Sequence, residues 1–189
     1  VWAWRSGRAR KMTNYIDHVL GILPFEPAAY VRLNGPVCTY VGHPLVSKIS
    51  LAKQAAVAER RSEAPMLLVM PGSRSSEVGR LLGPFGDAVA LLSEQSPGLR
   101  VEIPAVPHLK QYIQREIAHW PVQPELLTGE NAKFAAFSRA DAALVASGTA
   151  TLELALWGIP MVVGYKLDPI ARHLKWLGNV SSIVLPNLI

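Results

Sequence analysis

Short apolar runs alternate along the chain with longer segments in which apolar and polar residues recur at helical spacing. The most apolar runs, at residues 66–70, 142–145 and 161–163, have the length and composition of strands that a sheet buries on both faces. Further strands are predicted at residues 1–4, 18–23, 37–41, 100–104 and 125–128. Helices are predicted at residues 5–15, after 24–27, and at 45–63, 77–94, 108–119, 131–139, 151–157 and 168–177. This alternation predicts an α/β fold built on doubly wound parallel sheets.

The breaks between these elements predict two Rossmann-like domains, of which the first is only partly present. Residues 1–45 are interpreted as the C-terminal part of an N-terminal domain, and residues 46–64 as an interdomain linker. Residues 65–189 are interpreted as a second, truncated domain. The chain opens on VWAWR without an initiator Met and closes on SSIVLPNLI, so we expect it to be an internal fragment of a longer protein.

The rest of the chain is organised around a predicted βαβ unit at residues 140–165. Its first strand runs into the turn Ser147-Gly148-Thr149, and a helix predicted from Thr151 follows. Turns that follow a parallel strand are where such sheets place ligands. Free backbone N–H groups and the positive end of the helix dipole favour an anion there, most often phosphate. Gly148 permits close approach of the anion, and the hydroxyls of Ser147, Thr149 and Thr151 add donors.

Glu153 has two interpretations. It lies in the first turn of the predicted helix, where its carboxylate can accept hydrogen bonds from the two hydroxyls of a ribose. It can also belong to a capping box, in which a Ser or Thr caps the helix and the Glu stabilises the first turn. Taken alone, the local pattern favours the capping box.

The motif PGSR, at residues 71–74, marks a second functional turn. It follows the buried strand at residues 66–70, which is the usual phosphate position in such sheets. The turn is not a Walker A loop, since Gly-Lys-Ser/Thr is missing, and it is not a Rossmann G-x-G-x-x-G. Arg74 offers a planar, permanently charged fork that suits a diphosphate. A surface Arg in a polar turn is an equally weighted interpretation.

Composition narrows the range of functions. The net charge of +5 suits nucleic acid, anionic lipid or a phosphorylated substrate. The basic clusters lack the interleaved aromatic residues of a single-strand binding surface, so no nucleic-acid partner is predicted. The single cysteine, Cys38, excludes an internal disulfide framework and agrees with a reducing compartment.

Other kinds of active site have no signature in the chain. Without a Cys pair or an H-x-x-x-H spacing, no metal site is predicted. Without a G-x-S-x-G elbow, an α/β-hydrolase is disfavoured. His43, between Gly42 and Pro44, is a candidate substrate contact in the predicted interdomain cleft. A single His in a loop is more often structural.

Motifs along nearly the whole chain resemble one family. VWAWR, LPFE, VGHPL, PGSR-x-x-E, ASGTATLE with ALWGIPMVVGYK, and SIVLPNLI look like those of the lipid-A-disaccharide synthases and occur in the same order. Two phosphate-binding turns on Rossmann-like halves also resemble the GT-B layout, in which the C-terminal domain binds a nucleotide-sugar. By itself, S-G-T-x-T-x-E is similar to the muropeptide N-acetylglucosaminyltransferase and to UDP-N-acetylglucosamine 2-epimerase.

The resemblance implies an inverting transfer of 2,3-diacylglucosamine from UDP-2,3-diacylglucosamine to 2,3-diacylglucosamine 1-phosphate (lipid X). The products are lipid A disaccharide 1-phosphate and UDP, and no metal or other cofactor is expected. The family also implies a cytoplasmic enzyme of a Gram-negative bacterium, associated peripherally with the inner membrane and compatible with a homodimer.

The resemblance also assigns site residues. Those expected at the UDP diphosphate are Gly72, Ser73, Arg74, Ser147, Gly148, Thr149, Ala150 and Thr151. Glu153 is expected to hold the ribose, and Asn187 of the PNL motif to line the donor site. The acidic residue proposed as the catalytic base belongs to a part of the family that precedes Val1. The fragment alone is therefore expected to be inactive.

Two alternatives stay open. Another GT-B transferase or epimerase that uses UDP-N-acetylglucosamine would share the S-G-T turn but would need neither VWAWR nor LPNL. A non-catalytic nucleotide-sugar-binding module would keep the same turn, but would have no reason to carry PGSR, VGHPL and PNL together.

Overall fold

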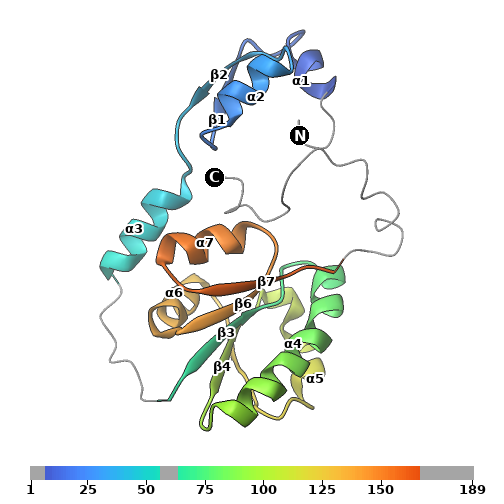
Figure 1. Ribbon diagram of the computed structural model, residues 1–189, viewed down its shortest axis with the longest axis vertical. Coiled ribbons are helices and arrows are strands. Elements are labelled where there is room, and N and C mark those ends of the chain that lie inside the picture. The colour runs from blue at the N-terminus through green and yellow to red at the C-terminus, as the bar shows by residue number, and fades with distance from the viewer. Residues whose placement is uncertain (1–6, 56–63, 167–189) are drawn as a thin grey trace. The chain divides into compact units, whose positions relative to one another are not determined.

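The computed structural model describes residues 7–55 and 64–166 of the chain (Figure 1). The described residues divide into two compact units, and the division falls inside helix α3 (Leu45–Ala55), between Lys48 and Ile49. The predicted strand at residues 1–4, the predicted helix at 168–177 and Asn187 lie outside the described residues. The predicted domain boundaries at residues 45 and 64 stay predictions.

The first unit contains a small βαβ motif. The short helix α1 (Gly7–Met12) comes first in the chain. Strand β1 (His18–Gly21) follows and pairs in parallel with β2 (Val37–Tyr40), and helix α2 (Glu26–Arg32) connects the two strands. The Glu26 carboxylate holds the β1–α2 turn, because its Oε2 accepts hydrogen bonds from the backbone N–H groups of Ile22 (2.8 Å) and Leu23 (3.0 Å). Burial first, and then the nearby Glu26 carboxylate, raise the pKa of the Cys38 thiol.

The second unit is a parallel sheet with the strand order β5-β4-β3-β6-β7. Its strands are β3 (Met66–Met70), β4 (Arg100–Pro104), β5 (Glu125–Leu127), β6 (Ala142–Ala146) and β7 (Met161–Gly164). Its helices are α4 (Ser75–Gln95), the 3₁₀ turn η1 (Pro107–Leu109), α5 (Lys110–Ile117), α6 (Glu130–Arg139) and α7 (Thr149–Trp157). The predicted class, an α/β fold with parallel sheets, is therefore confirmed.

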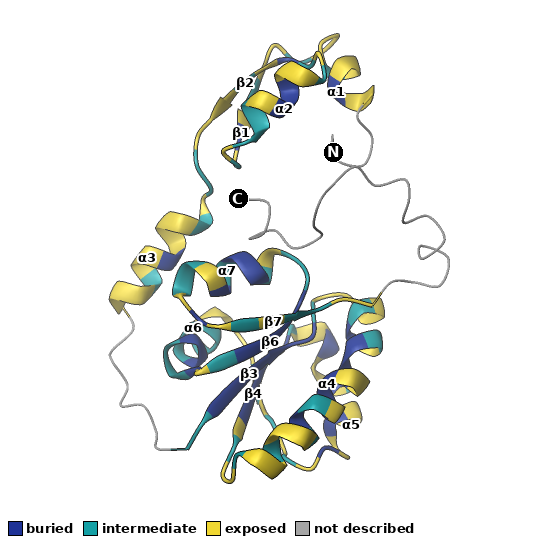
Figure 2. Cartoon of the chain, viewed as in Figure 1, coloured by how far each residue is buried: buried dark blue, intermediate teal, exposed yellow. Residues whose placement is uncertain are grey.

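The central strand β3 is buried on both faces, as its continuous apolar sequence predicts. Successive side chains of a strand point to opposite faces. Leu67 and Val69 accordingly pack into a core with α4 and α5, whereas Leu68 and Met70 pack into a second core with α6 and α7. Figure 1 shows the two helix pairs on opposite faces of the sheet, and Figure 2 shows the buried strands between them. The sheet is thus a rigid layer whose strand ends can position a site.

Several helix boundaries differ from the prediction. Helix α4 begins at Ser75 rather than at residue 77, and its N-cap residue Arg74 is extended, with φ −112° and ψ 139°. The predicted helix at residues 108–119 begins with the turn η1 and ends at Ile117. No helix within the described ranges 7–55 and 64–166 is long and apolar enough to cross a bilayer.

A glutamate carboxyl group is buried in the sheet. The side chain of Glu102 on β4 is 2% exposed, and its carboxylate contacts Arg139 of α6 at 2.9 Å and Arg100 at 3.3 Å. Arg139 is itself only 23% exposed. A carboxylate in such a place is tolerated only because it is paired, so this contact ties α6 to the sheet.

We therefore expect Glu102→Ala to lower the free energy of unfolding by about 3 kcal/mol, since it leaves the largely buried Arg139 guanidinium without this carboxylate. Urea denaturation of the full-length protein, followed by circular dichroism, measures the change. Glu116→Ala, at an exposed position of α5, is the matched control and should cost less than about 0.5 kcal/mol. Equal losses for the two variants would contradict a structural role for the buried pair.

Candidate functional site

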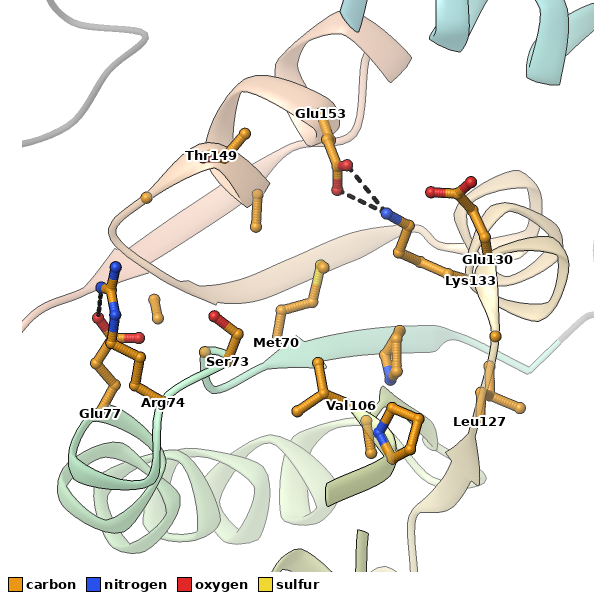
Figure 3. A pocket seen from close by; sticks show the side chains of 18 of the residues that line it. Met70, Ser73, Arg74, Glu77, Val106, Leu127, Glu130, Lys133, Thr149 and Glu153 are labelled. Carbon is orange, nitrogen blue, oxygen red and sulfur yellow. Dashed lines mark hydrogen bonds and ion pairs between the residues drawn. The ribbon is translucent and has the colours of Figure 1, made fainter. Parts of the chain in front are cut away.

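The strand order places a topological switch point between β3 and β6. From β3 the chain passes to β4 and β5 on one side, and then returns to β6 and β7 on the other side. The turns after β3 and β6 therefore leave the same sheet edge in opposite directions, and the space between them is where open parallel sheets bind ligands. A cavity of about 510 Å³ lies there, lined by residues that follow β3, β4, β5 and β6 (Figure 3). Both turns singled out in the sequence contribute to it.

The PGSR turn forms one end of this cavity. Gly72 has φ +116°, a conformation that side-chain-bearing residues rarely adopt, and a Cβ there would lie 2.8 Å from Glu77 Oε2. Ser73 and Arg74 line the cavity and are exposed. The Arg74 side chain is 78% exposed, and its guanidinium pairs with the Glu77 carboxylate at 2.8 Å (Figure 3). The turn thus presents a cation whose partner, Glu77, lies in the first turn of α4.

The second turn places the start of α7 at the same cavity. Gly148 is the N-cap residue of α7, and no side chain caps this helix. The first N–H groups of a helix lack partners within the helix, so they and the helix dipole favour an anion. Ser147, Gly148, Thr149 and Ala150 all line the cavity. A Cβ built on Gly148 would meet no atom within 4 Å, so there is open space beside its backbone.

Thr151 contributes to the turn and does not line the cavity. Its side chain is fully buried, and its hydroxyl donates a hydrogen bond to the backbone carbonyl of Gly148 at 2.7 Å. Its backbone N–H also donates to the same carbonyl, at 3.1 Å. The expectation that this hydroxyl points to a ligand is therefore corrected: Thr151 fixes the shape of the turn.

Glu153 lies in the second turn of α7, because the helix begins at Thr149 rather than at residue 151. The capping box is absent here, since the N-cap is a glycine and no side chain caps the helix. Both Glu153 carboxylate oxygens instead accept hydrogen bonds from Lys133 Nζ, each at 3.0 Å. Glu153 lines the cavity, at the opposite end from Arg74 in Figure 3.

Lys133 and Glu130, from the start of α6, are cavity residues that the sequence did not single out. The signal available for them was positional: α6 follows β5, and helices that follow parallel strands begin at the ligand-binding edge. Apolar side chains form another part of the lining, among them Met70, Val106 and Leu127. The cavity therefore combines cationic, anionic and apolar surfaces.

His43 lies in the first unit, outside this cavity. Its ring Nδ1 accepts a hydrogen bond from the backbone N–H of Leu45 at 3.1 Å, at the start of α3. This contact supports the structural interpretation of a single loop His. Among residues 7–55 and 64–166, no three His, Cys, Asp or Glu side chains gather closely enough to hold a metal ion.

Fold and cavity together define a GT-B-like class of α/β protein, and solved structures share that fold. UDP-GlcNAc 2-epimerase from Neisseria meningitidis, solved with UDP-GlcNAc, matches with a TM-score of 0.64 at 15% identity, over 91% of this chain and 51% of its own. The S. aureus MnaA–UDP co-structure matches with a TM-score of 0.61 at 14% identity, over 84% of this chain and 46% of its own. At these identities the likeness shows the fold alone.

The sequence comparisons identify the family. The family model described as Lipid-A-disaccharide synthetase matches residues 1–189. Lipid-A-disaccharide synthases of Nitrobacter winogradskyi and Bradyrhizobium diazoefficiens are each 50% identical to this chain over its whole length, and that of Ruegeria pomeroyi is 42% identical. The chain belongs to the lipid-A-disaccharide synthase family. It spans about half the length of these curated relatives, 48%, 49% and 50% respectively.

The geometry of the PGSR turn predicts that Gly72→Ala costs about 1–3 kcal/mol of unfolding free energy, because alanine disfavours φ +116° and its Cβ would crowd Glu77. Urea denaturation of the full-length protein measures the loss. Ser73→Ala, at the exposed neighbouring position, is the control and should stay within about 0.5 kcal/mol of wild type. If the Gly72→Ala variant were as stable as the control, the turn would not require glycine at position 72, and the prediction would be wrong.

Proposed function

We propose that the full-length protein that contains this chain is an inverting glycosyltransferase of lipid A biosynthesis. It transfers 2,3-diacylglucosamine from UDP-2,3-diacylglucosamine to 2,3-diacylglucosamine 1-phosphate, and releases UDP. The observation that carries the proposal is the meeting of Arg74 and the start of α7 at one cavity, in a chain whose family model match extends over its full length. The Arg74 guanidinium and the N–H groups at the start of α7 both favour binding of a diphosphate.

In this proposal the donor diphosphate lies between the two turns. Arg74 turns from Glu77 to the phosphate oxygens, and the backbone N–H groups at Gly148, Thr149 and Ala150 donate to them. Gly72 and Ser73 shape the other wall. Because Arg74 and α7 neutralise charge that grows on the departing UDP, they stabilise the transition state as well as the donor. The two solved structures of this fold, one with UDP and the other with UDP-GlcNAc, support a nucleotide-sugar ligand in this proposal.

The ribose lies toward Glu153, whose carboxylate accepts hydrogen bonds from its two hydroxyls. Asn187 is assigned to the donor site by its place in the PNL motif. The sugar is transferred in one displacement: the acceptor 6-hydroxyl attacks the anomeric carbon, the bond to UDP breaks, and a base takes the hydroxyl proton. The family resemblance assigns the proposed base to a part of the full-length protein outside this chain, so we expect this chain alone to lack activity.

The acylated substrates suggest where the enzyme works. Both sugars carry acyl chains that partition into a bilayer, so a peripheral position on the inner membrane would bring the enzyme to them. A cytoplasmic location and a homodimer are part of the same proposal. Another UDP-sugar transferase or an epimerase is the second candidate, favoured only by the fold shared with the solved epimerase.

The proposal is tested by measuring UDP release by the full-length protein from UDP-2,3-diacylglucosamine, with 2,3-diacylglucosamine 1-phosphate as acceptor. We expect Arg74→Ala and Glu153→Ala each to lower kcat/KM by about tenfold to a hundredfold, the value of one or two hydrogen bonds to a charged group. Arg74→Ala should leave stability nearly unchanged, because its ion pair with Glu77 is exposed.

Arg115→Ala is the matched control, since Arg115 is exposed on α5 and outside the cavity lining, and it should keep wild-type activity. If the wild type releases UDP from plain UDP-N-acetylglucosamine but not from the acylated donor, the second candidate replaces the proposal. If Arg74→Ala and the control are equally active, the diphosphate site is elsewhere.

A further inference from the structure

Lys133 is the basic side chain of the cavity that the proposed function leaves without a role. It comes from the second turn of α6, and its Nζ donates to both oxygens of Glu153 on α7. The side chains of Lys133 and Glu153 are only 18% and 12% exposed. Because both side chains are largely covered, solvent ions screen this pair far less than they screen a surface pair.

The Lys133 side chain packs against an aromatic cluster of Phe134, Phe137 and Trp157. Phe134 stacks on Trp157 with 5.7 Å between ring centroids and an angle of 8°, and Phe137 meets both rings edge to face. The Lys133 ammonium lies 4.8 Å from the centroid of the Phe134 ring. Since Phe134 is on α6 and Trp157 is on α7, the cluster holds the two helices together beneath the ion pair. The Lys133 ammonium therefore lies between the Phe134 ring and the Glu153 carboxylate.

The pair leaves part of the carboxylate available. A carboxylate has about four acceptor positions, and Lys133 occupies one on each oxygen. The second acceptor position on each oxygen can take a hydrogen bond from a hydroxyl group in the cavity, which Glu153 lines (Figure 3). An ammonium that is held in place therefore orients the carboxylate toward a vicinal diol without blocking it.

We propose that Lys133 is a positioning residue that makes Glu153 selective for the two ribose hydroxyls of the nucleotide. This inference rests on the proposed function, because it assumes that a uridine nucleotide occupies the cavity. Lys133 acts through Glu153 and does not touch the phosphates. Its removal should therefore weaken ribose recognition and leave diphosphate recognition intact.

The experiment compares binding of UDP with binding of 2′,3′-dideoxy-UDP, which lacks both hydroxyls, by isothermal titration calorimetry on the full-length protein. Wild type should prefer UDP by about tenfold or more, from two hydrogen bonds to a charged acceptor. Lys133→Met keeps the aliphatic stem over Phe134 but removes the charge, and should reduce that preference at least about fivefold. Lys133→Arg should retain most of the preference. The ratio of the two dissociation constants does not depend on the fraction of folded protein.

Two controls complete the test. Lys110→Met makes the same change at an exposed position of α5 outside the cavity lining, and should keep the wild-type ratio. In a Glu153→Ala background, Lys133→Met should change the ratio no further. Equal weakening of both nucleotides by Lys133→Met, or an unchanged ratio, overturns the inference while the proposed function stands. A wild type that binds neither nucleotide overturns the proposed function, and this inference with it.

Discussion

The parallel pairing of β3 with β6 is the constraint on which the site depends. Leu67 lies opposite Ala142 and Met70 opposite Val145, so the two strands end together. Asp141 anchors the start of this register, because its carboxylate accepts a hydrogen bond from Met66 N–H at 2.9 Å and its own N–H donates to the Met66 carbonyl at 3.0 Å. A slip of one residue would send each β3 side chain to the opposite face. The register therefore brings the PGSR turn and the start of α7 to one cavity.

Packing on the two faces of the sheet decides which helices can contribute charged groups. The face of Leu68 and Met70 carries α6 and α7, and the aromatic contacts of Phe134 and Phe137 with Trp157 hold these helices side by side. Lys133 and Glu153 meet only because of that packing. The same face contains the buried Glu102–Arg139 contact between β4 and α6. The Lys133–Glu153 and Glu102–Arg139 ion pairs thus help to fix the position of α6 beside the cavity.

Local sequence carries most of the fold and about half of the site. Continuous apolar runs indicate buried strands, and Gly, Ser and Pro indicate turns. The sheet and both turns that line the cavity could therefore be predicted. The partner of Glu153 could not, because Lys133 is 20 residues away and the contact depends on how two helices pack. The role of Thr151 was also hidden. Whether a hydroxyl faces the cavity or its own turn is decided by where α7 begins, and boundaries are the least certain feature of sequence reading.

The two ends of the cavity differ in how their charges are held, and this difference fits their proposed tasks. Arg74 is paired with Glu77 at an exposed position, where an ion pair contributes at most about 1 kcal/mol. An incoming diphosphate can therefore draw the guanidinium away at little cost. Glu153 is held by Lys133 in a covered position above an aromatic cluster, so its geometry is set before any ligand arrives. In the proposed complex, the movable Arg74 guanidinium binds the diphosphate, and the fixed Glu153 carboxylate selects the ribose of the same nucleotide.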